Sequence, residues 1–122
     1  MQTQATPAKT AGQWRTDFLV DYHGEGQPPC GLQKCPPPKP GTWHMIEGWN
    51  NTYTCLRTLS DSENSIYCEF ADTENFVEFY DIAADPWQLH NVAKQLAPVL
   101  RDRLKERLQE LRACAGTTCR AL

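Results

Sequence analysis

The sequence lacks the features of several large protein classes. No apolar run approaches the ~20 residues that a membrane-spanning helix needs. Basic residues are not in excess, because 12 Lys and Arg stand against 15 Asp and Glu, and the net charge is −3. This balance provides no basic surface for nucleic acid or for anionic lipid. We therefore expect neither a nucleic-acid partner nor a membrane span.

Catalytic and metal-binding motifs are also missing. The three histidines, His23, His44 and His90, have no metal-ligand spacing, and neither H-x-x-x-H nor C-x-x-C occurs. No serine lies in G-x-S-x-G, and no glycine-rich phosphate loop follows a strand. Glu69 and Glu78 could face each other on neighbouring strands, although solvated strand residues are the simpler interpretation. We therefore assign no catalytic residue and no metal ligand.

Cysteine, in contrast, is abundant. Six cysteines in 122 residues are typical of a protein from an oxidising compartment. Among the connectivities that six cysteines allow, spacing favours three local pairs: Cys30 with Cys35, Cys55 with Cys68, and Cys114 with Cys119. Asn50 begins an N-N-T glycosylation acceptor, which agrees with secretion. The first residues, MQTQATP, contain no apolar signal segment. We therefore expect the chain to be the later part of a longer protein.

Four short runs predict an antiparallel sheet. They are rich in β-branched and aromatic residues and span 14–22, 50–57, 66–70 and 76–81. The breaks between the last three runs, DSEN and DTE, consist of residues that favour turns. Pairing Cys55 with Cys68 across a hairpin places Asp61 and Ser62 at its tip. Cysteine spacing and turn chemistry therefore predict the same register.

A long amphipathic helix is predicted near the C-terminus. Its apolar positions recur every three or four residues: Leu96, Ala97, Leu100, Leu104, Leu108 and Leu111. Pro98 suits the first turn, Gly116 ends the helix, and the charged residues, Arg107 among them, are expected to face water. The predicted fold is therefore α+β, with a small antiparallel sheet of about four strands and the helix on one face. Both faces of the sheet carry apolar side chains, so we expect the second face to dock on a missing domain.

The domain organisation predicted from composition is simple. Residues 1–13 are polar without periodicity and predict a disordered tail, and residues 14–122 form one folded unit with a Pro-rich loop at 27–41. His23 follows a predicted strand and enters a loop flanked by glycines, where binding side chains are common. It is our candidate binding residue, and an ordinary loop histidine is the alternative.

Several stretches resemble N-acetylglucosamine-6-sulfatases. They are 14–26 (WRTDFLVDYHGEG), 50–58 (NNTYTCLRT), 67–70 (YCEF), 76–86 (FVEFYDIAADP) and 114–120 (CAGTTCR). The Y-D-x-x-x-D-P tract is typical of sulfatases in general, whereas N-N-T-Y-x-C and C-x-G-x-T-C indicate the glucosamine-6-sulfatase branch. The resemblance covers residues 14–120. It implies a C-terminal subdomain, a small antiparallel sheet with a long helix, that packs against an N-terminal catalytic domain.

The resemblance also implies what the parent enzyme does. Such enzymes are lysosomal or secreted and hydrolyse sulfate esters of sulfated glycosaminoglycans such as heparan or keratan sulfate. They use calcium and a formylglycine made from the first residue of C-x-P-x-R, both in the N-terminal domain. Cys35 begins C-P-P-P-K, which has lysine in place of the arginine. We therefore expect this chain alone to be inactive and to hold no cofactor, with His23 as a sugar contact. The alternative is a stand-alone secreted module that binds a glycan or a protein without catalysis.

Overall fold

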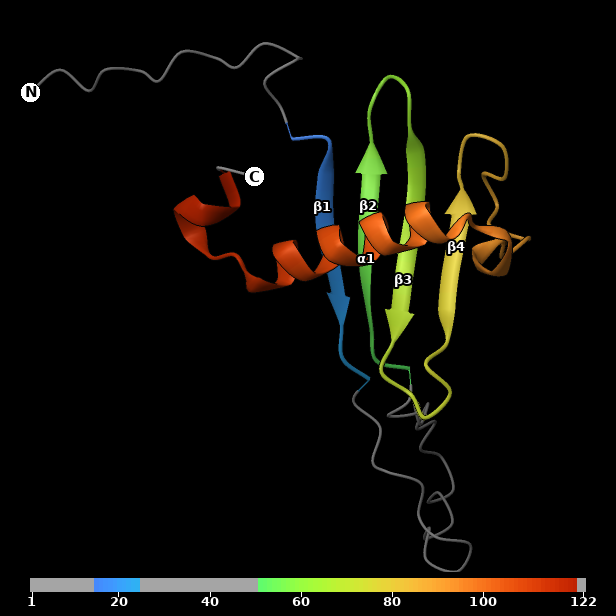
Figure 1. Cartoon of the computed structure of the whole chain (residues 1–122), viewed down its shortest axis with the longest axis horizontal. Coiled ribbons are helices and arrows are strands. Elements are labelled where there is room, and N and C mark those ends of the chain that lie inside the picture. Colours follow the sequence, from blue (N-terminus) through green and yellow to red (C-terminus); the bar gives the residue numbers. More distant parts are fainter. Residues whose placement is uncertain (1–14, 25–50, 121–122) are drawn as a thin grey trace, which may run out of the picture.

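The computed structural model describes residues 15–24 and 51–120. Its elements are β1 (Asp17–Tyr22), β2 (Tyr53–Leu59), β3 (Asn64–Phe70), β4 (Val77–Asp81), η2 (Ala93–Gln95), α1 (Pro98–Ala113) and η3 (Gly116–Arg120). The strands form one antiparallel sheet in the order β1-β2-β3-β4, and α1 crosses one face of it (Figure 1). The α+β prediction is confirmed. The predicted tail and Pro-rich loop lie outside the described residues, as do Cys30, Cys35 and Asn50.

The central hairpin has the predicted register. Cys55 pairs with Cys68 across β2 and β3, and the two form a disulfide with their Cα atoms 4.0 Å apart. So short a separation agrees with a non-hydrogen-bonded pair, in which side chains lie closest. The turn closes through Ser60, whose N–H donates to Glu63 O (2.7 Å) and whose Oγ accepts from Glu63 N (3.0 Å). Local turn chemistry and the crosslink therefore specify the same pairing.

The outer strands are shorter than the runs that predicted them. β1 begins at Asp17 rather than at residue 14, because β2 ends at Leu59 and the Leu59 N–H donates to Thr16 O (2.7 Å) as the chain turns away. The turn from β3 to β4 is held by Asp72, whose Oδ1 accepts from Glu74 N and Phe76 N, both at 3.0 Å. Pairing thus stops where the neighbouring strand ends.

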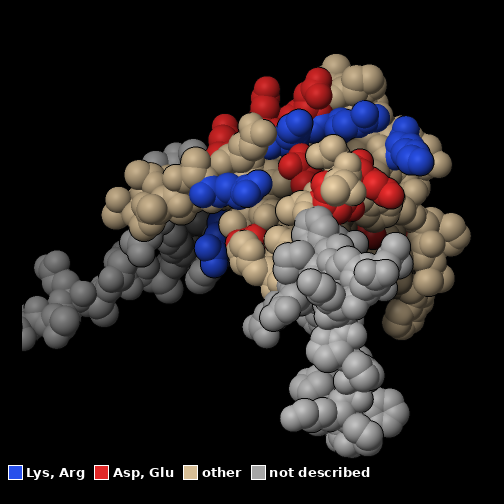
Figure 2. Space-filling model, turned by 90° about the horizontal axis from the view of Figure 1, so that it is seen from below, with Lys and Arg blue, Asp and Glu red and all other residues tan. Residues whose placement is uncertain are grey.

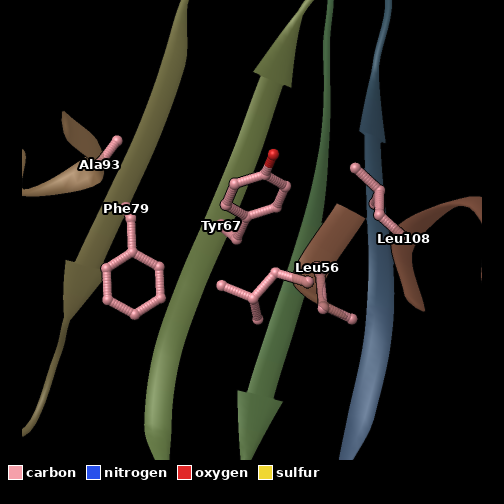
Figure 3. Packing of buried hydrophobic residues seen from close by; sticks show 6 residues of the cluster. Leu56, Tyr67, Phe79, Ala93 and Leu108 are labelled. Atoms are coloured by element: carbon pink, nitrogen blue, oxygen red, sulfur yellow. The ribbon is translucent and has the colours of Figure 1, made fainter. Parts of the chain in front are cut away.

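The hydrophobic core lies between α1 and one face of the sheet. Leu56 and Tyr67 are each 2% exposed and project from neighbouring strands toward Leu108, which is fully buried (Figure 3). Phe79 and Ala93 extend this cluster over β4. The core side chains of the sheet come from alternate positions of each strand, as one face of a pleated sheet requires.

The helix matches its predicted stripe except at Ala97. Leu104 and Leu108 are buried, and the stripe leucines at 96, 100 and 111 pack partly against the core. Ala97 is exposed and precedes the helix, which starts with Pro98 in its first turn. α1 ends at Ala113, before Gly116, and no helix among the described residues is long and apolar enough to cross a membrane.

One helix residue contradicts the prediction that the charged residues face water. Arg107 is only 26% exposed, and its Nε lies 2.6 Å from Asp17 Oδ2 of β1. Its Nη1 also lies 2.9 Å from Glu110 Oε2. The remaining charged positions of the central turns, among them Arg101, Arg103 and Lys105, are exposed as expected.

Candidate docking face

The sheet has a second face that no described element covers. Alternation along the paired strands places the following side chains on it, which we call the open face: Phe18, Val20, Tyr22, Tyr53, Cys55, Arg57, Ile66, Cys68, Phe70, Glu78 and Tyr80. α1 lies on the opposite side (Figure 1). Within residues 15–24 and 51–120, this face is mostly apolar, and Phe18 and Val20 are 40% and 36% exposed.

Charge is distributed unevenly between the two sides of the molecule. Exposed Arg, Lys, Asp and Glu residues of α1 crowd the side that carries the helix, and in Figure 2 the blue and red side chains gather along the upper part of the view. The open face contributes only Arg57 and Glu78 from its strands. An apolar surface set against a charged one is typical of a face that packs on another protein surface.

Aromatic rings form a continuous row along one end of the open face. The ring centroids of Tyr22 and Tyr53 are 5.2 Å apart, those of Tyr53 and Phe70 are 5.2 Å apart, and those of Phe70 and Phe76 are 5.4 Å apart. These separations lie in the favourable range for aromatic pairs. The row connects β1, β2 and β3 with the residue just before β4. Such rings offer a large contact area for little loss of side-chain entropy.

Arg57 is the cation of the open face. Its guanidinium is half-buried and bonds Thr58 O, Ser65 O at 3.0 Å and Asn64 Oδ1 at 2.5 Å. No ion pair joins it to a carboxylate of the described residues. The side chain is therefore oriented by backbone and amide oxygens, next to the aromatic and aliphatic side chains of the face.

His23, the predicted binding residue, stands at the end of β1 in a small polar cluster. Its Nε2 lies 3.2 Å from Asp21 Oδ2, and Asp21 Oδ1 accepts a hydrogen bond from Thr54 Oγ1 at 2.8 Å. The imidazole is 78% exposed. Thr54 is buried, so it anchors Asp21, which in turn orients the ring. The second ring nitrogen, Nδ1, has no partner among the described residues.

The two glutamates that could have formed an acid–base pair lie apart. Glu69 is on the helix face and accepts a hydrogen bond from Tyr67 Oη at 2.9 Å, whereas Glu78 is on the open face opposite Cys68. Burial, and then the bond to Glu69, raises the pKa of Tyr67. Burial and Glu78 raise the pKa of Tyr80 as well. The idea that the two carboxylates face each other is wrong. Glu69 pairs with Val77 and Glu78 pairs with Cys68, and this offset of one residue puts the two side chains on opposite faces of the sheet.

The connection after β4 is held in place by the side chain of Asn91. Asn91 Oδ1 accepts from Phe79 N (3.1 Å) and Ala93 N (3.0 Å), and its Nδ2 donates to Val77 O (3.0 Å). Asp85 Oδ2 accepts from His90 N at 2.8 Å, and this bond lowers the pKa of Asp85. Asn91 thus bonds to residues of β4 that lie twelve and fourteen positions away in sequence.

Metal-ligating groups do not come together in the described part of the chain. No three His, Cys, Asp or Glu side chains there form a group that could hold a metal ion. Of the predicted cysteine pairs, Cys114–Cys119 is a disulfide with Cα atoms 5.0 Å apart, at the end of α1. The C-P-P-P-K stretch and the acceptor Asn50 lie outside the described residues.

Comparison with known proteins identifies relatives of one kind. No protein-family model matches the chain. It is 44% identical over 113 residues to N-acetylglucosamine-6-sulfatase of Bos taurus and 43% identical to that of Homo sapiens, in each case over 88% of this chain. It is also 46% identical over 70 residues, 57% of the chain, to a putative extracellular sulfatase Sulf-1 homolog of Caenorhabditis elegans, of which this match covers 10%.

The match covers only part of these proteins. The chain spans about a fifth of the length of the bovine and human relatives (20% of each). The similarity includes the strands, the disulfide hairpin and the helix, because it extends over nearly the whole chain. The chain is therefore a sulfatase relative, similar to one segment of the N-acetylglucosamine-6-sulfatases.

Proposed function

We propose that this chain is the C-terminal subdomain of an N-acetylglucosamine-6-sulfatase-like enzyme, lysosomal or secreted. In this role it supports a catalytic domain that hydrolyses sulfate esters of a sulfated glycosaminoglycan such as heparan or keratan sulfate. The observation that carries the proposal is the open face. A two-sided sheet with one helical cover, in a chain that spans 20% of its relatives, is best explained by docking on the remainder of such an enzyme.

The open face has the composition of an interface centre. Phe18, Val20 and the aromatic row supply apolar contact, and Arg57 supplies one cation within it. Aromatic residues and arginine are enriched at the positions that contribute most to binding energy in protein–protein interfaces. We assign the contact with the catalytic domain to this face.

His23 is the candidate substrate contact. It follows Tyr22, which ends the aromatic row, and its exposed imidazole is oriented by Asp21 at the end of β1. A residue at the margin of a docked subdomain can reach into a cleft between the two domains, where ligand sites are common. We assign to it a hydrogen bond to the sugar, and no step in bond cleavage.

Calcium and formylglycine belong, in this proposal, to the catalytic domain. The described residues contain no group of three potential metal-ligating side chains. Cys35, outside the described residues, lies in a stretch that lacks the arginine of C-x-P-x-R. We therefore derive no chemical step from this chain and predict that it hydrolyses no sulfate ester on its own.

A chimera tests the proposal. The matched segment of the bovine enzyme is replaced by this chain, and hydrolysis of a fluorogenic N-acetylglucosamine-6-sulfate is measured with calcium present. We expect activity from the chimera and none from the isolated chain above a heat-treated control. In the chimera, His23→Ala should raise KM several-fold with a smaller change in kcat.

A pair of matched substitutions tests whether the open face is the contact surface. Val20→Glu places a charge among the apolar side chains of this face and should abolish activity or secretion, whereas Arg112→Glu, on the exposed helix surface, should leave both unchanged. Turnover by the isolated chain would contradict the proposal. So would a secreted chimera whose activity is insensitive to Val20→Glu. Glycan binding by the isolated chain with an inactive chimera would favour the stand-alone module.

A further inference from the structure

The outer edge of β1 has backbone groups that bond to no other backbone group in the described part of the chain. In an antiparallel pair, the residues of one strand bond alternately to the neighbour and to the outside. Thr16 O accepts from Leu59 N, so Phe18, Val20 and Tyr22 also direct their backbone groups toward β2. The N–H and C=O groups of Asp17, Leu19 and Asp21 then point away from the sheet. No backbone hydrogen bond within the described ranges reaches them.

The opposite edge of the sheet differs. On β4 the outward groups of Val77 and Phe79 are satisfied by the segment before α1. Asn91 bonds Val77 O and Phe79 N, and Val92 N donates to Phe79 O at 3.0 Å. Proteins commonly cover or interrupt sheet edges, because a free edge invites pairing with another strand. Within residues 15–24 and 51–120, the chain thus closes one edge with its own residues and leaves the other open.

A hollow lies beside the open edge. α1 extends past β1, and the chain continues into η3 beyond the sheet (Figure 1). A hollow of about 510 Å³ is lined there by Phe18 and Leu19 of β1, by Arg107 and Leu111 of α1, and by Cys114 and Cys119. The Cys114–Cys119 disulfide joins Cys119, near the end of η3, to Cys114, directly after α1. Helix and disulfide together form a wall over the place where a fifth strand would lie.

We propose that this edge slot, formed by β1, Leu111 and the Cys114–Cys119 disulfide, receives an extended strand from the polypeptide that makes up the rest of the enzyme. The inference rests on the proposed function but concerns a different surface from the open face. The occupant follows from two observations: about four-fifths of the relatives' length lies outside the match, and Phe18 belongs both to the slot and to the open face. One partner can therefore contact both surfaces continuously.

The slot specifies the chemistry of the strand. Backbone pairing with Asp17, Leu19 and Asp21 supplies affinity that is independent of sequence, as in other cases of strand addition. Side chains on the helix side of the added strand lie under Leu111 and the disulfide, so they must be apolar. Asp17 is neutralised by Arg107, so its carboxylate does not repel an apolar or weakly acidic strand.

Peptide binding tests the slot directly. The probes are overlapping 15-residue peptides that cover the bovine N-acetylglucosamine-6-sulfatase outside the matched segment. Each is titrated against the purified, oxidised chain by fluorescence anisotropy. We expect at least one to bind and to slow hydrogen exchange of the Leu19 amide at least tenfold, because that N–H becomes paired.

Two kinds of variant assign the binding site. N-methylation of alternate peptide amides should weaken binding about tenfold for the set that faces β1 and little for the other set, without altering the chain. Leu111→Glu should weaken binding, whereas Arg112→Glu should not. Absence of binding by every peptide, or equal binding by both methylated forms, would overturn the inference. An active chimera together with failed peptide binding would reject the slot and leave the proposed function standing.

Discussion

Asp17 and Arg107, which are 90 positions apart in sequence, form a two-point ion pair between the first strand and the helix. Arg107 Nε donates to Asp17 Oδ2 at 2.6 Å and Nη2 donates to Asp17 Oδ1 at 3.0 Å. The side chain of Arg107 is 26% exposed and that of Asp17 is 17% exposed. This pairing with Asp17 raises the pKa of Arg107, which is therefore charged in the folded chain. The pair fixes the position of α1 relative to β1, and hence the width of the edge slot.

Arg107→Met should destabilise the chain by about 1.5–3 kcal/mol, because Asp17 keeps a half-buried carboxylate without its cation. Urea unfolding followed by circular dichroism gives the free energy of unfolding. Arg112→Met, an exposed position on the same helix, is the control and should change it by less than about 0.5 kcal/mol. Equal effects of the two substitutions would show that the ion pair contributes nothing.

Tyr67→Phe should make the chain less sensitive to alkaline pH. Burial and the Glu69 hydrogen bond raise the pKa of Tyr67 above its ordinary value of 10.0. The folded state thus holds this proton more tightly than the unfolded state. Stability from this group is complete below pH 10 and is lost as pH rises from there toward the folded pKa, by up to about 1.4 kcal/mol per pH unit.

The measurement compares guanidinium unfolding at pH 8 and at pH 11. At pH 8 the variant should be less stable by about 1 kcal/mol through loss of the bond to Glu69. At pH 11 the difference should shrink, because the variant has no phenol to ionise at this position. Parallel decline of both proteins with pH would argue against a raised Tyr67 pKa.

The two described disulfides should differ in their effect on stability. Cys55 and Cys68 are 13 positions apart and crosslink the centre of the sheet, a loop worth about 3 kcal/mol in the chain-entropy estimate. Replacement of both by alanine should cost at least that much. Replacement of Cys114 and Cys119, 5 positions apart, should cost about 2 kcal/mol or less and should speed amide exchange only around η3. An unchanged melting temperature under reductant would refute the first expectation.

Asn91→Ala should open the edge of β4. The substitution leaves Phe79 N and Val77 O without their amide partner, at a cost of about 1–3 kcal/mol. Hydrogen exchange at the Phe79 amide should accelerate, and β4 should become available for pairing between molecules. Lys94→Ala, at an exposed position in η2, should have neither effect. Unchanged exchange at Phe79 would mean that another group protects this edge.

Local signals predicted most of the fold. The register of β2 and β3 could be predicted from the cysteine spacing and the turn residues, because both signals lie within one short hairpin. The apolar stripe of α1 is likewise a local pattern and correctly marked Leu104 and Leu108 as core. A second apolar face was expected because the strands carry apolar side chains on both sides and the sequence predicts one helix, and no element of the described residues covers this face.

Features that depend on three-dimensional placement were not predicted. No pattern connects Asp17 with Arg107, because a pair so distant in sequence depends on where the helix crosses the sheet. The same holds for the hollow beside β1, which lies where α1 extends past this strand (Figure 1). The bonds from Asn91 to β4 could not be predicted either, because they depend on the path that the chain takes back along the strand.

Gly24 and Thr52 mark the two ends of the connection between β1 and β2. The Gly24 N–H donates to Thr52 Oγ1 at 3.0 Å, so the chain departs and returns at nearly one point. A connection whose two ends already lie together can vary in length at little cost, because the entropy cost of loop closure grows only slowly with loop length. Exchange of residues 25–50 for a tight turn should therefore preserve the sheet, and homologous enzymes are free to carry very different insertions at this junction.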